Sequence, residues 1–342
     1  MNFRKPVKKL LYAANKNPLS VFIHNNSLSE RARMPLTSIV PLSQKISMFA
    51  PFTNEIHQPN DWYGHASNLK TYLGLEKNYQ FKFILEHGLY LNDQVDNLDV
   101  EADLPTIITY SDYRLKILRE YRPNMFSIGP FIHYAKSYLT DGEIEKEKKR
   151  LGESLLFFPA HSTPVIGFEY DIKKLCRKIK KIAGDRTVRI CLYWKDILLG
   201  RHKTYQDFGF ECVTAGHMLD PLFLPRLKSL ISISDLTASN IVSSHVGFCI
   251  YMNKPHIVIS EELKMKTSRN WNKRINEGFK SEGYVEVLEE FSKLNYKITQ
   301  KQKNLITKYW GSDRTRTKAE LKKIILQTEK LYKEFKSDHI LT

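Results

Sequence analysis

The side chains best suited to chemistry lie in residues 235–247, where small hydroxyl and amide groups stand at the predicted start of a helix. The polar residues nearest the predicted helix start are Ser239, Asn240, Ser243, Ser244 and His245. A helix start leaves backbone N–H groups unpaired and carries partial positive charge, which suits a phosphate. An ordinary capped helix would use the same residue types. The stretch therefore predicts either a phosphate site or a plain helix cap.

Most other apolar runs also stop at polar or ionisable groups. These are His24 and Asn25; Glu86 and His87; Ser111 and Asp112; His161, Ser162 and Thr163; Trp194, Lys195 and Asp196; and Thr214 and His217. Ligands of open parallel sheets bind beyond the carboxyl ends of the strands, so we expect such residues to converge on one site. Taken alone, each histidine fits a buried, hydrogen-bonded side chain better than a catalytic one.

The elements that must position these residues alternate between strands and helices. Strands are predicted at residues 19–23, 81–85, 106–109, 125–128, 155–158, 188–193, 210–213 and 256–259. Helices are predicted at residues 61–73, 112–121 and 170–183, after Asp220-Pro221, and from the T-x-x-E capping box at Thr317. This alternation is typical of α/β proteins with parallel sheets and helices on both sides.

At 342 residues the chain is long enough for two domains. Residues 140–153 are almost wholly charged and predict a linker between them. We therefore expect two Rossmann-like domains facing one another across a cleft, over residues 1–150 and 151–316, followed by a C-terminal helix over residues 317–342.

Composition points to a soluble globular protein, with 42% apolar and 26% charged residues. No apolar run is long enough to cross a membrane, and no secretory signal is recognisable. The four cysteines lack metal-site or disulfide spacing and predict buried thiols in the cytoplasm. The net charge of +16 favours an anionic partner, such as a phosphorylated substrate or the inner membrane surface. Nucleic acid is disfavoured because no binding signature for it is present.

Several motifs with a known mechanism are missing from the sequence. It contains no G-x-x-x-x-G-K-[ST], no H-E-x-x-H and no G-x-S-x-G, and no G-x-G-x-x-G follows the first strand. This weighs against P-loop NTPases, zinc proteases, α/β-hydrolases and NAD enzymes. No D-x-D cluster follows a strand, which argues against metal-dependent single-domain glycosyltransferases. We therefore predict neither a metal site nor a bound cofactor.

Four runs together carry a resemblance to a known family. They are residues 157–163, 191–196, 213–217 and 239–247, the last followed by Lys254-Pro255. The chain resembles bacterial two-domain (GT-B type) glycosyltransferases of capsule and O-antigen synthesis. It is more distantly similar to CDP-glycerol glycerophosphotransferases and GT-B sialyltransferases. Those families show His-Pro where this chain has His161-Ser162, so the identity of the donor is not carried over.

The resemblance implies metal-independent transfer of a sugar from a nucleotide sugar to a surface polysaccharide or lipid-linked glycan. The second domain would hold this co-substrate, and the first would bind the acceptor. The implied donor-binding residues are His161, Ser162, Thr163, Lys195, His217, Ser239, Asn240, Ser243, Ser244 and His245. The implied base is His87 or Glu86, with Asp112 as the alternative. These residues also have simpler structural interpretations. Glu86 and His87 would form a hydrogen-bonded pair at a strand end, and Lys195 and Asp196 would form a surface ion pair.

Two rival functions stay open at this point. One is transfer of a CDP-activated polyol phosphate, and the other is a non-catalytic subunit that binds a polyanion or the membrane. The sequence does not give the donor nucleotide, the sugar, the acceptor, the linkage, the stereochemical course or the oligomeric state.

Overall fold

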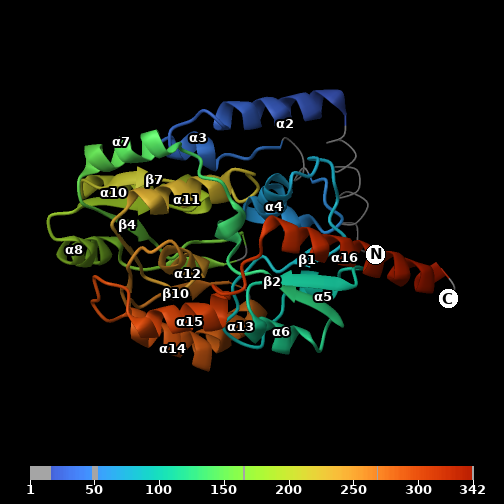
Figure 1. Ribbon diagram of the computed structural model, residues 1–342. Helices are drawn as coiled ribbons and strands as arrows, with labels where there is room; N and C mark the ends of the chain where they lie inside the picture. The colour runs from blue at the N-terminus through green and yellow to red at the C-terminus, as the bar shows by residue number, and fades with distance from the viewer. Residues whose placement is uncertain (1–16, 48–52, 165, 268, 341–342) are drawn as a thin grey trace.

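The computed structural model describes residues 17–47, 53–164, 166–267 and 269–340. The protein is an α/β structure with two parallel sheets and a helical C-terminal region (Figure 1). Its strands are β1 (Ile84–Leu85), β2 (Thr106–Thr109), β3 (Asn124–Ser127), β4 (Ser154–Phe158), β5 (Gly167–Glu169), β6 (Thr187–Cys191), β7 (Glu211–Val213), β8 (Leu236–Ser239), β9 (His256–Val258) and β10 (Lys264–Lys266).

The described helices alternate with these strands. They are α2 (Pro18–Arg31), α3 (Ile39–Ser43), α4 (His65–Leu73), α5 (Asn97–Val100), α6 (Asp112–Leu118), α7 (Asp141–Leu151), α8 (Ile172–Ala183), α9 (Trp194–Leu198), α10 (His202–Asp207), α11 (Phe223–Ile233), α12 (Ser244–Tyr251), α13 (Arg269–Phe279), α14 (Glu282–Phe291), α15 (Gln300–Trp310) and α16 (Lys318–Ile340), with the 3-10 helices η1 (Gln58–Gly64) and η2 (Phe131–Tyr134).

The larger sheet has the strand order β7-β6-β4-β8-β9, and all its pairs are parallel. The chain runs from β4 outward through β6 to β7, and then returns to the other side of β4 through β8 and β9. The connections after β4 and β8 therefore leave their strands in opposite directions. In sheets of this kind, the carboxyl ends of two such strands border the ligand crevice.

The smaller sheet is β1-β2-β3, also parallel throughout. The strand predicted at residues 106–109 is confirmed as β2, whereas only Ile84 and Leu85 of the run 81–85 form β1. The Asn60 side chain hydrogen-bonds the backbone at this short edge strand. Its Nδ2 donates to the Phe83 carbonyl (2.8 Å) and its Oδ1 accepts from Leu85 N–H (2.7 Å). A side chain thus occupies backbone groups that a neighbouring strand would otherwise use.

The core follows from the alternation of side chains along β4. Leu155 and Phe157 face one side of the larger sheet, where they pack with α8 and α10. Leu156 and Phe158 face the other side, toward α11 and α12, in a core that continues into the smaller sheet. The two sheets therefore share one apolar core.

The strand predicted at residues 19–23 is wrong, because this run lies inside α2. Asn17 caps the helix by accepting from Ser20 N–H (2.9 Å), and Pro18 occupies its first turn. The segment that follows α2 contacts the loop after β7. The Leu36 and Leu42 carbonyls accept from the backbone N–H groups of Thr214 (3.1 Å) and His217 (2.9 Å).

Residues 140–153, the predicted linker between domains, form helix α7 over most of their length, and the domain boundary stays a prediction. Thr140 and Glu143 form a reciprocal capping box at its start. Ile144 and Leu151 are buried against Ile233 of α11. A charged run thus forms a solvated helix with two buried apolar side chains, Ile144 and Leu151.

The helix predicted at residues 61–73 begins later than expected, at His65. Asp61 lies within η1 instead of capping the helix, and the chain turns sharply at Tyr63 and Gly64, which both have positive φ. This turn separates η1 from α4 and directs Tyr63 away from the helix.

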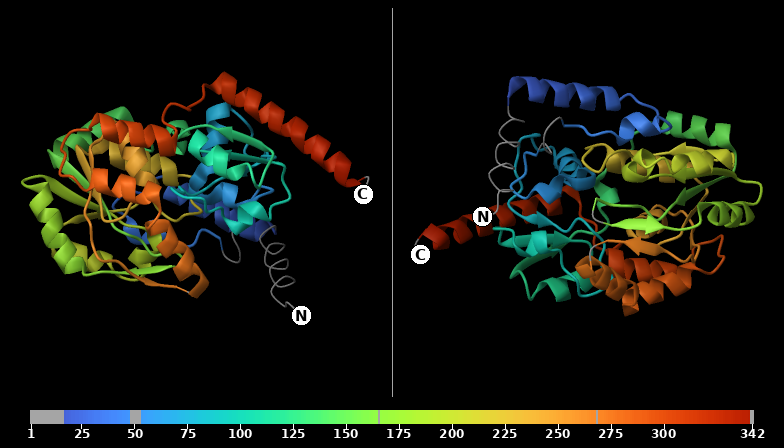
Figure 2. Two further views of the ribbon diagram at one scale, coloured as in Figure 1. Left: turned by 90° about the horizontal axis from the view of Figure 1, so that it is seen from below. Right: turned by 180° about the vertical axis from the view of Figure 1, so that it is seen from behind.

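The C-terminal helix α16 begins at the predicted capping box of Thr317 and Glu320. It lies against α4 and β2 of the first half and extends beyond the body of the protein (Figures 1 and 2). The Arg316 guanidinium anchors its start by donating to the Ser127 carbonyl (3.2 Å). The chain therefore returns to the smaller sheet after completing the larger one.

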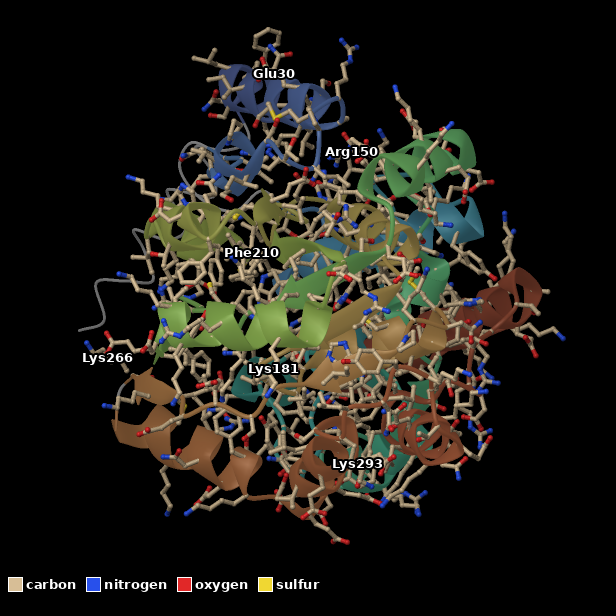
Figure 3. The ribbon with its side chains drawn as sticks, turned by 90° about the vertical axis from the view of Figure 1, so that its left-hand side faces the viewer. Glu30, Arg150, Lys181, Phe210, Lys266 and Lys293 are labelled. Atoms are coloured by element: carbon tan, nitrogen blue, oxygen red, sulfur yellow. The ribbon has the colours of Figure 1, made fainter. Side chains whose placement is uncertain are left out.

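The amphipathic helix predicted at residues 170–183 corresponds to α8. Its buried face carries Leu175, Cys176 and Ile179, and its basic outer face includes Lys181 (Figure 3). None of the described helices is long and apolar enough to cross a bilayer. The four cysteines are free thiols.

Candidate functional site

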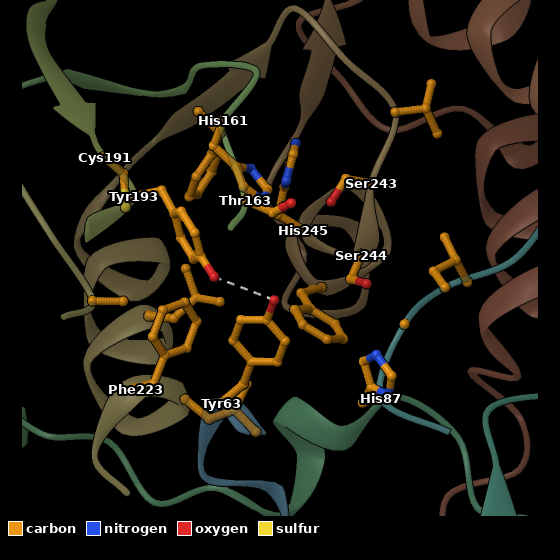
Figure 4. Close-up of a pocket in the computed structure, with 18 of the residues that line it drawn as sticks. Tyr63, His87, His161, Thr163, Cys191, Tyr193, Phe223, Ser243, Ser244 and His245 are labelled. Carbon is orange, nitrogen blue, oxygen red and sulfur yellow. Dashed lines mark hydrogen bonds between the residues drawn. The ribbon is translucent and has the colours of Figure 1, made fainter. Parts of the chain in front are cut away.

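A cavity of about 440 Å³ lies between the carboxyl ends of the two parallel sheets (Figure 4). Its lining residues are Tyr63, His65, His87, Gly88, Leu89, Tyr90, Tyr110, Phe158, Pro159, His161, Thr163, Ile166, Cys191, Leu192, Tyr193, Ala215, Phe223, Leu224, Leu227, Val242, Ser243, Ser244, His245 and Phe248. The volume is that of a pocket for a small organic ligand. Apolar and aromatic walls with a few hydroxyl and imidazole groups are also typical of such pockets.

The segments after β4 and β8 supply one wall. His161 and Thr163 follow β4, and Ser243 and Ser244 follow β8. These are the strands between which the chain reverses direction, so this wall lies where ligands bind in parallel sheets. Ser243 is the N-cap residue of α12, but its side chain makes no capping hydrogen bond. The two serine hydroxyls therefore line the cavity beside the N-terminus of a helix.

Helix α15 holds the start of α12 in place. The Trp310 Nε1–H donates to the Ser244 carbonyl (3.0 Å). The fully buried indole lies directly on Gly247, where an added Cβ would collide with the ring. The position of the serine pair is thus set by an element outside the cavity.

His245 adds a neutral imidazole to the same wall. Its ring stacks on Phe158 (centroids 4.7 Å apart, 19° between planes), and its Nε2 is buried without a hydrogen-bond partner among the described residues. Burial lowers the pKa of His245 well below its ordinary value of 6.5, and the nearby His256 and His161 add to this effect. At neutral pH the ring is uncharged and can donate or accept one hydrogen bond.

His161 and Thr163 are held by groups behind the cavity. The His161 ring packs on Tyr193 (4.4 Å between centroids), and burial lowers its pKa although Asp196 opposes that shift. The Thr163 carbonyl accepts from the Lys195 ammonium, and its hydroxyl accepts from Ile166 N–H (3.1 Å). Lys195 is therefore directed at backbone and does not line the cavity, in contrast to the expected contact with a leaving phosphate.

The opposite wall comes from the first half of the chain, and its histidines are His65 and His87. The His87 imidazole meets Trp62 edge to face (4.4 Å), and its Nδ1 is buried with no hydrogen-bond partner in the described part of the chain. Burial lowers the pKa of His87, although Asp99, Asp96 and Glu86 oppose the shift. His87 is therefore a neutral base at pH 7, with a ring nitrogen able to accept a proton.

Glu86 does not fit the expected role of a base. Its carboxylate forms a buried ion pair with Arg114 (Nη2–Oε1 2.5 Å) and accepts from the Thr109 hydroxyl. Arg114 also donates to the carbonyls of Asn92 (2.6 Å) and Gln94 (2.9 Å). The pair fixes the loop that leaves β1, next to His87, but it does not line the cavity.

Asp112 also lies outside the cavity. It accepts from Ser127 Oγ (2.7 Å) and pairs with Arg314 (2.7 Å) at a half-exposed position. Of the three predicted bases, His87 alone lines the cavity.

Four predicted donor-binding residues lie behind the lining and form its turns. Ser162 N–H donates to Asp196 (3.0 Å), and Asn240 Oδ1 accepts from Ala160 N–H (2.6 Å). Ser239 Oγ donates to the Ile241 carbonyl (2.8 Å). His217 accepts from Leu219 N–H (3.2 Å), and burial lowers its pKa to about 4. These side chains shape the wall from behind.

The tyrosines of the cavity and His65 were not among the predicted site residues. Tyr193 is the last residue of a predicted strand, so the expectation that ligands bind at strand ends could have included it. Tyr63 and His65 precede the smaller sheet and reach the cavity through the turn at Gly64. The local sequence signal for this turn is the pattern Trp-Tyr-Gly-His. No group of three or more His, Cys, Asp or Glu side chains suited to a metal ion occurs among the described residues.

Comparisons with known proteins add no assignment: no protein-family model matches the chain, and no curated protein gives a significant match.

Proposed function

We propose that the protein is a glycosyltransferase that moves a sugar from a nucleotide-activated donor to a glycan or lipid-linked acceptor. The observation that carries the proposal is the composition of the cavity walls. The serine pair at the start of α12 comes from the larger sheet, and the neutral imidazole of His87 comes from the smaller one. A phosphate site and a base on opposite walls are the two parts that sugar transfer needs.

The donor binds on the wall of the larger sheet. Ser243 and Ser244 donate hydrogen bonds to its phosphate, with the positive end of α12 behind them. As the bond between the sugar carbon and the phosphate oxygen breaks, negative charge grows on the leaving phosphate. Groups already oriented toward that charge stabilise the transition state more than the ground state. Neutral His245 and His161 supply further hydrogen-bonding groups beside the serines.

The acceptor binds on the wall of the smaller sheet. His87 accepts the proton of the attacking hydroxyl as the acceptor oxygen bonds to the sugar carbon. Its lowered pKa suits that role, because the imidazole is unprotonated at neutral pH. Surrounding aromatic rings exclude water, which limits hydrolysis of the donor.

The chain arrangement supports the same assignment. The smaller parallel sheet carries the acceptor wall of the cavity, and the larger parallel sheet carries the donor wall. Helix α16 then returns to the first half of the chain. We propose that these halves form the GT-B arrangement of two Rossmann-like domains. The basic outer face of α8 is suited to an anionic membrane surface, where a lipid-linked acceptor would lie.

Titration calorimetry with uridine, guanosine, cytidine and adenosine mono- and diphosphates tests the donor site. We expect the wild type to bind at least one nucleotide, and Ser244→Ala and His161→Ala to lose about tenfold in affinity or more. Ser162→Ala is the matched control, because Ser162 adjoins His161 but lies behind the lining. Absence of binding, or equal losses in all three variants, would refute the proposal. A preference for cytidine nucleotides would favour a CDP-alcohol or CMP-sugar donor.

A further inference from the structure

Two tyrosines from different halves of the chain meet inside the cavity. Tyr63 belongs to η1, before the smaller sheet, and Tyr193 follows β6 of the larger sheet. Their phenol oxygens lie 3.5 Å apart. Figure 4 shows the Tyr63 hydroxyl directed at that of Tyr193, with Ser244 and His87 on the other side of Tyr63. The pair is a direct contact between the halves within the proposed site.

The backbone of Tyr63 is held in an unfavourable conformation. Its φ of 57° lies in the left-handed region, which bulky residues rarely adopt. Its N–H donates to the Met218 carbonyl (2.6 Å), and the neighbouring Gly64 packs so closely on Pro221 that a Cβ would collide with it. Contacts with the turn at residues 218–221 therefore fix the strained residue. Strain of this kind is concentrated at functional sites.

The hydroxyl groups of the pair have one hydrogen more than they can use between themselves. Two phenols carry two hydrogens, and the bond between them uses one. A second tyrosine pair in the protein provides the contrast. Tyr205 meets Tyr170 (3.3 Å), and Tyr170 passes its own hydrogen to the Ala160 carbonyl (3.1 Å). The cavity pair has no such acceptor among the described residues, so one O–H is left for a ligand.

Tyr63 and Tyr193 both stay protonated at neutral pH. Burial raises the pKa of Tyr63, and it raises that of Tyr193 well above its ordinary value of 10. The available group is therefore a neutral donor, suited to an uncharged oxygen. Flat rings flank it: Phe223 lies 5.1 Å from the Tyr63 ring, and His161 lies 4.4 Å from the Tyr193 ring. Such surfaces pack well on the C–H face of a sugar.

We propose that the Tyr63–Tyr193 pair recognises the transferred sugar by donating a hydrogen bond to one of its hydroxyl or ring oxygens. This inference rests on the proposed function, because it takes Ser243 and Ser244 as the phosphate site and His87 as the base. The reacting carbon must lie between those two walls, and the tyrosine pair lines the same cavity. The pair then selects the sugar and holds the halves together around it.

The test compares binding of free nucleotides with binding of the same nucleotides carrying a sugar. UDP with UDP-glucose, GDP with GDP-mannose, and CMP with CMP-N-acetylneuraminate serve as probes in calorimetry. The variants are Tyr63→Phe and Tyr193→Phe, which keep the rings and remove one hydroxyl each. Tyr205→Phe is the control, because it breaks the tyrosine pair that lies outside the cavity. Thermal unfolding of each variant checks that the fold is retained.

We expect both cavity variants to bind the sugar-carrying nucleotide about tenfold more weakly, with affinity for the free nucleotide within about twofold of wild type. Tyr205→Phe should change neither affinity. Equal losses of affinity for the free and the sugar-carrying nucleotide would mean that the tyrosines bind the nucleotide. No loss of affinity for either would mean that they have no role in binding. Each of these results overturns the proposal. If the wild type binds the free nucleotides but no sugar nucleotide, the sugar assignment fails while the nucleotide site stands. Binding of no probe at all refutes the proposed function itself.

Discussion

The Trp310 indole N–H donates to the Ser244 carbonyl at 3.0 Å, and this bond connects α15 to the first turn of α12. The next residue, Gly311, ends α15 so close to the Tyr110 carbonyl that an added Cβ would collide with it. Tyr110 lines the opposite wall of the cavity. The end of α15 therefore fixes both walls at once, and with them the spacing between the proposed phosphate site and the smaller sheet.

Trp310→Phe should weaken donor binding without unfolding the protein. The smaller ring removes the hydrogen bond to Ser244 and leaves a small void, at a cost of about 1–3 kcal/mol. The start of α12 then becomes less well positioned, so affinity for the preferred nucleotide should fall severalfold. Chemical denaturation and calorimetry measure the two effects.

Tyr309→Phe is the control for the Trp310 variant. It lies in the same helix and loses the hydrogen bond to Glu286 (2.9 Å), whereas the hydrogen bond to the Ser244 carbonyl comes from Trp310. We expect a stability loss with unchanged nucleotide affinity. A loss of affinity as large as that in Trp310→Phe would mean that general loosening of α15, and not the contact with Ser244, causes the effect.

Gly247→Ala should destabilise the protein by about 1–3 kcal/mol, because the new methyl group must displace the Trp310 ring. The same change at Gly142 of α7 meets no atom within 4 Å. There, alanine should stabilise the helix by up to about 1 kcal/mol. Urea unfolding of the two variants checks that their unfolding free energies change in opposite directions. Stabilisation by Gly247→Ala would contradict the close packing of α15 on α12.

Glu86→Gln should act on stability and not on proton transfer. It leaves the fully buried Arg114 guanidinium without its counter-charge, and breaking a buried pair in this way costs about 3–5 kcal/mol. The exposed pair of Lys330 with Glu334 gives the comparison, since Glu334→Gln should stay within about 0.5 kcal/mol of wild type. Unfolding in guanidinium chloride measures the stability of the two variants against wild type. A fully stable Glu86→Gln protein would show that the ion pair has no structural role.

Stability should fall in acid because buried histidines are neutral in the folded state. Burial lowers the pKa of His256 from 6.5 to about 3. The unfolded chain therefore binds this proton at a higher pH than the folded one. The contribution is complete above pH 6.5 and is lost as the pH falls toward 3, by at most about 1.4 kcal/mol per pH unit.

His256→Gln tests this linkage, because glutamine does not titrate and can still hydrogen-bond to Thr237 and Ser239. Unfolding free energies measured between pH 7 and pH 4 should fall less steeply in the variant than in the wild type. Equal slopes would mean that His256 is not buried in its neutral form.

Sequence reasoning found the strands with short apolar runs and clear turns, such as residues 106–109 and 155–158. It failed where local signals compete. Residues 19–23 are β-branched and aromatic enough for a strand, but the cap at Asn17 and Pro18 starts a helix there. In residues 140–153 the charge pattern concealed a T-x-x-E capping box, the signal that was correctly used at Thr317.

The expectation that ligands bind at the carboxyl ends of parallel strands predicted six residues that line the cavity. They are His87, His161, Thr163, Ser243, Ser244 and His245. It could not tell which neighbours face inward, because a shift of one residue turns a side chain to the other side. Ser162 lies behind the wall although it stands between His161 and Thr163. Tyr63 reaches the cavity only through a strained turn fixed by residues 218–221, and such long-range contacts have no local signature.

The most direct test of the central claim is release of free nucleotide from a panel of sugar nucleotides, in the presence of lipid-linked and polysaccharide acceptors. We expect the wild type to release nucleotide from one donor with formation of a glycosylated acceptor. His87→Asn should transfer at least about 100-fold more slowly while binding the nucleotide normally. Transfer by His87→Asn at the wild-type rate would contradict the proposed base. No transfer from any donor by a wild type that binds no nucleotide would contradict the account as a whole.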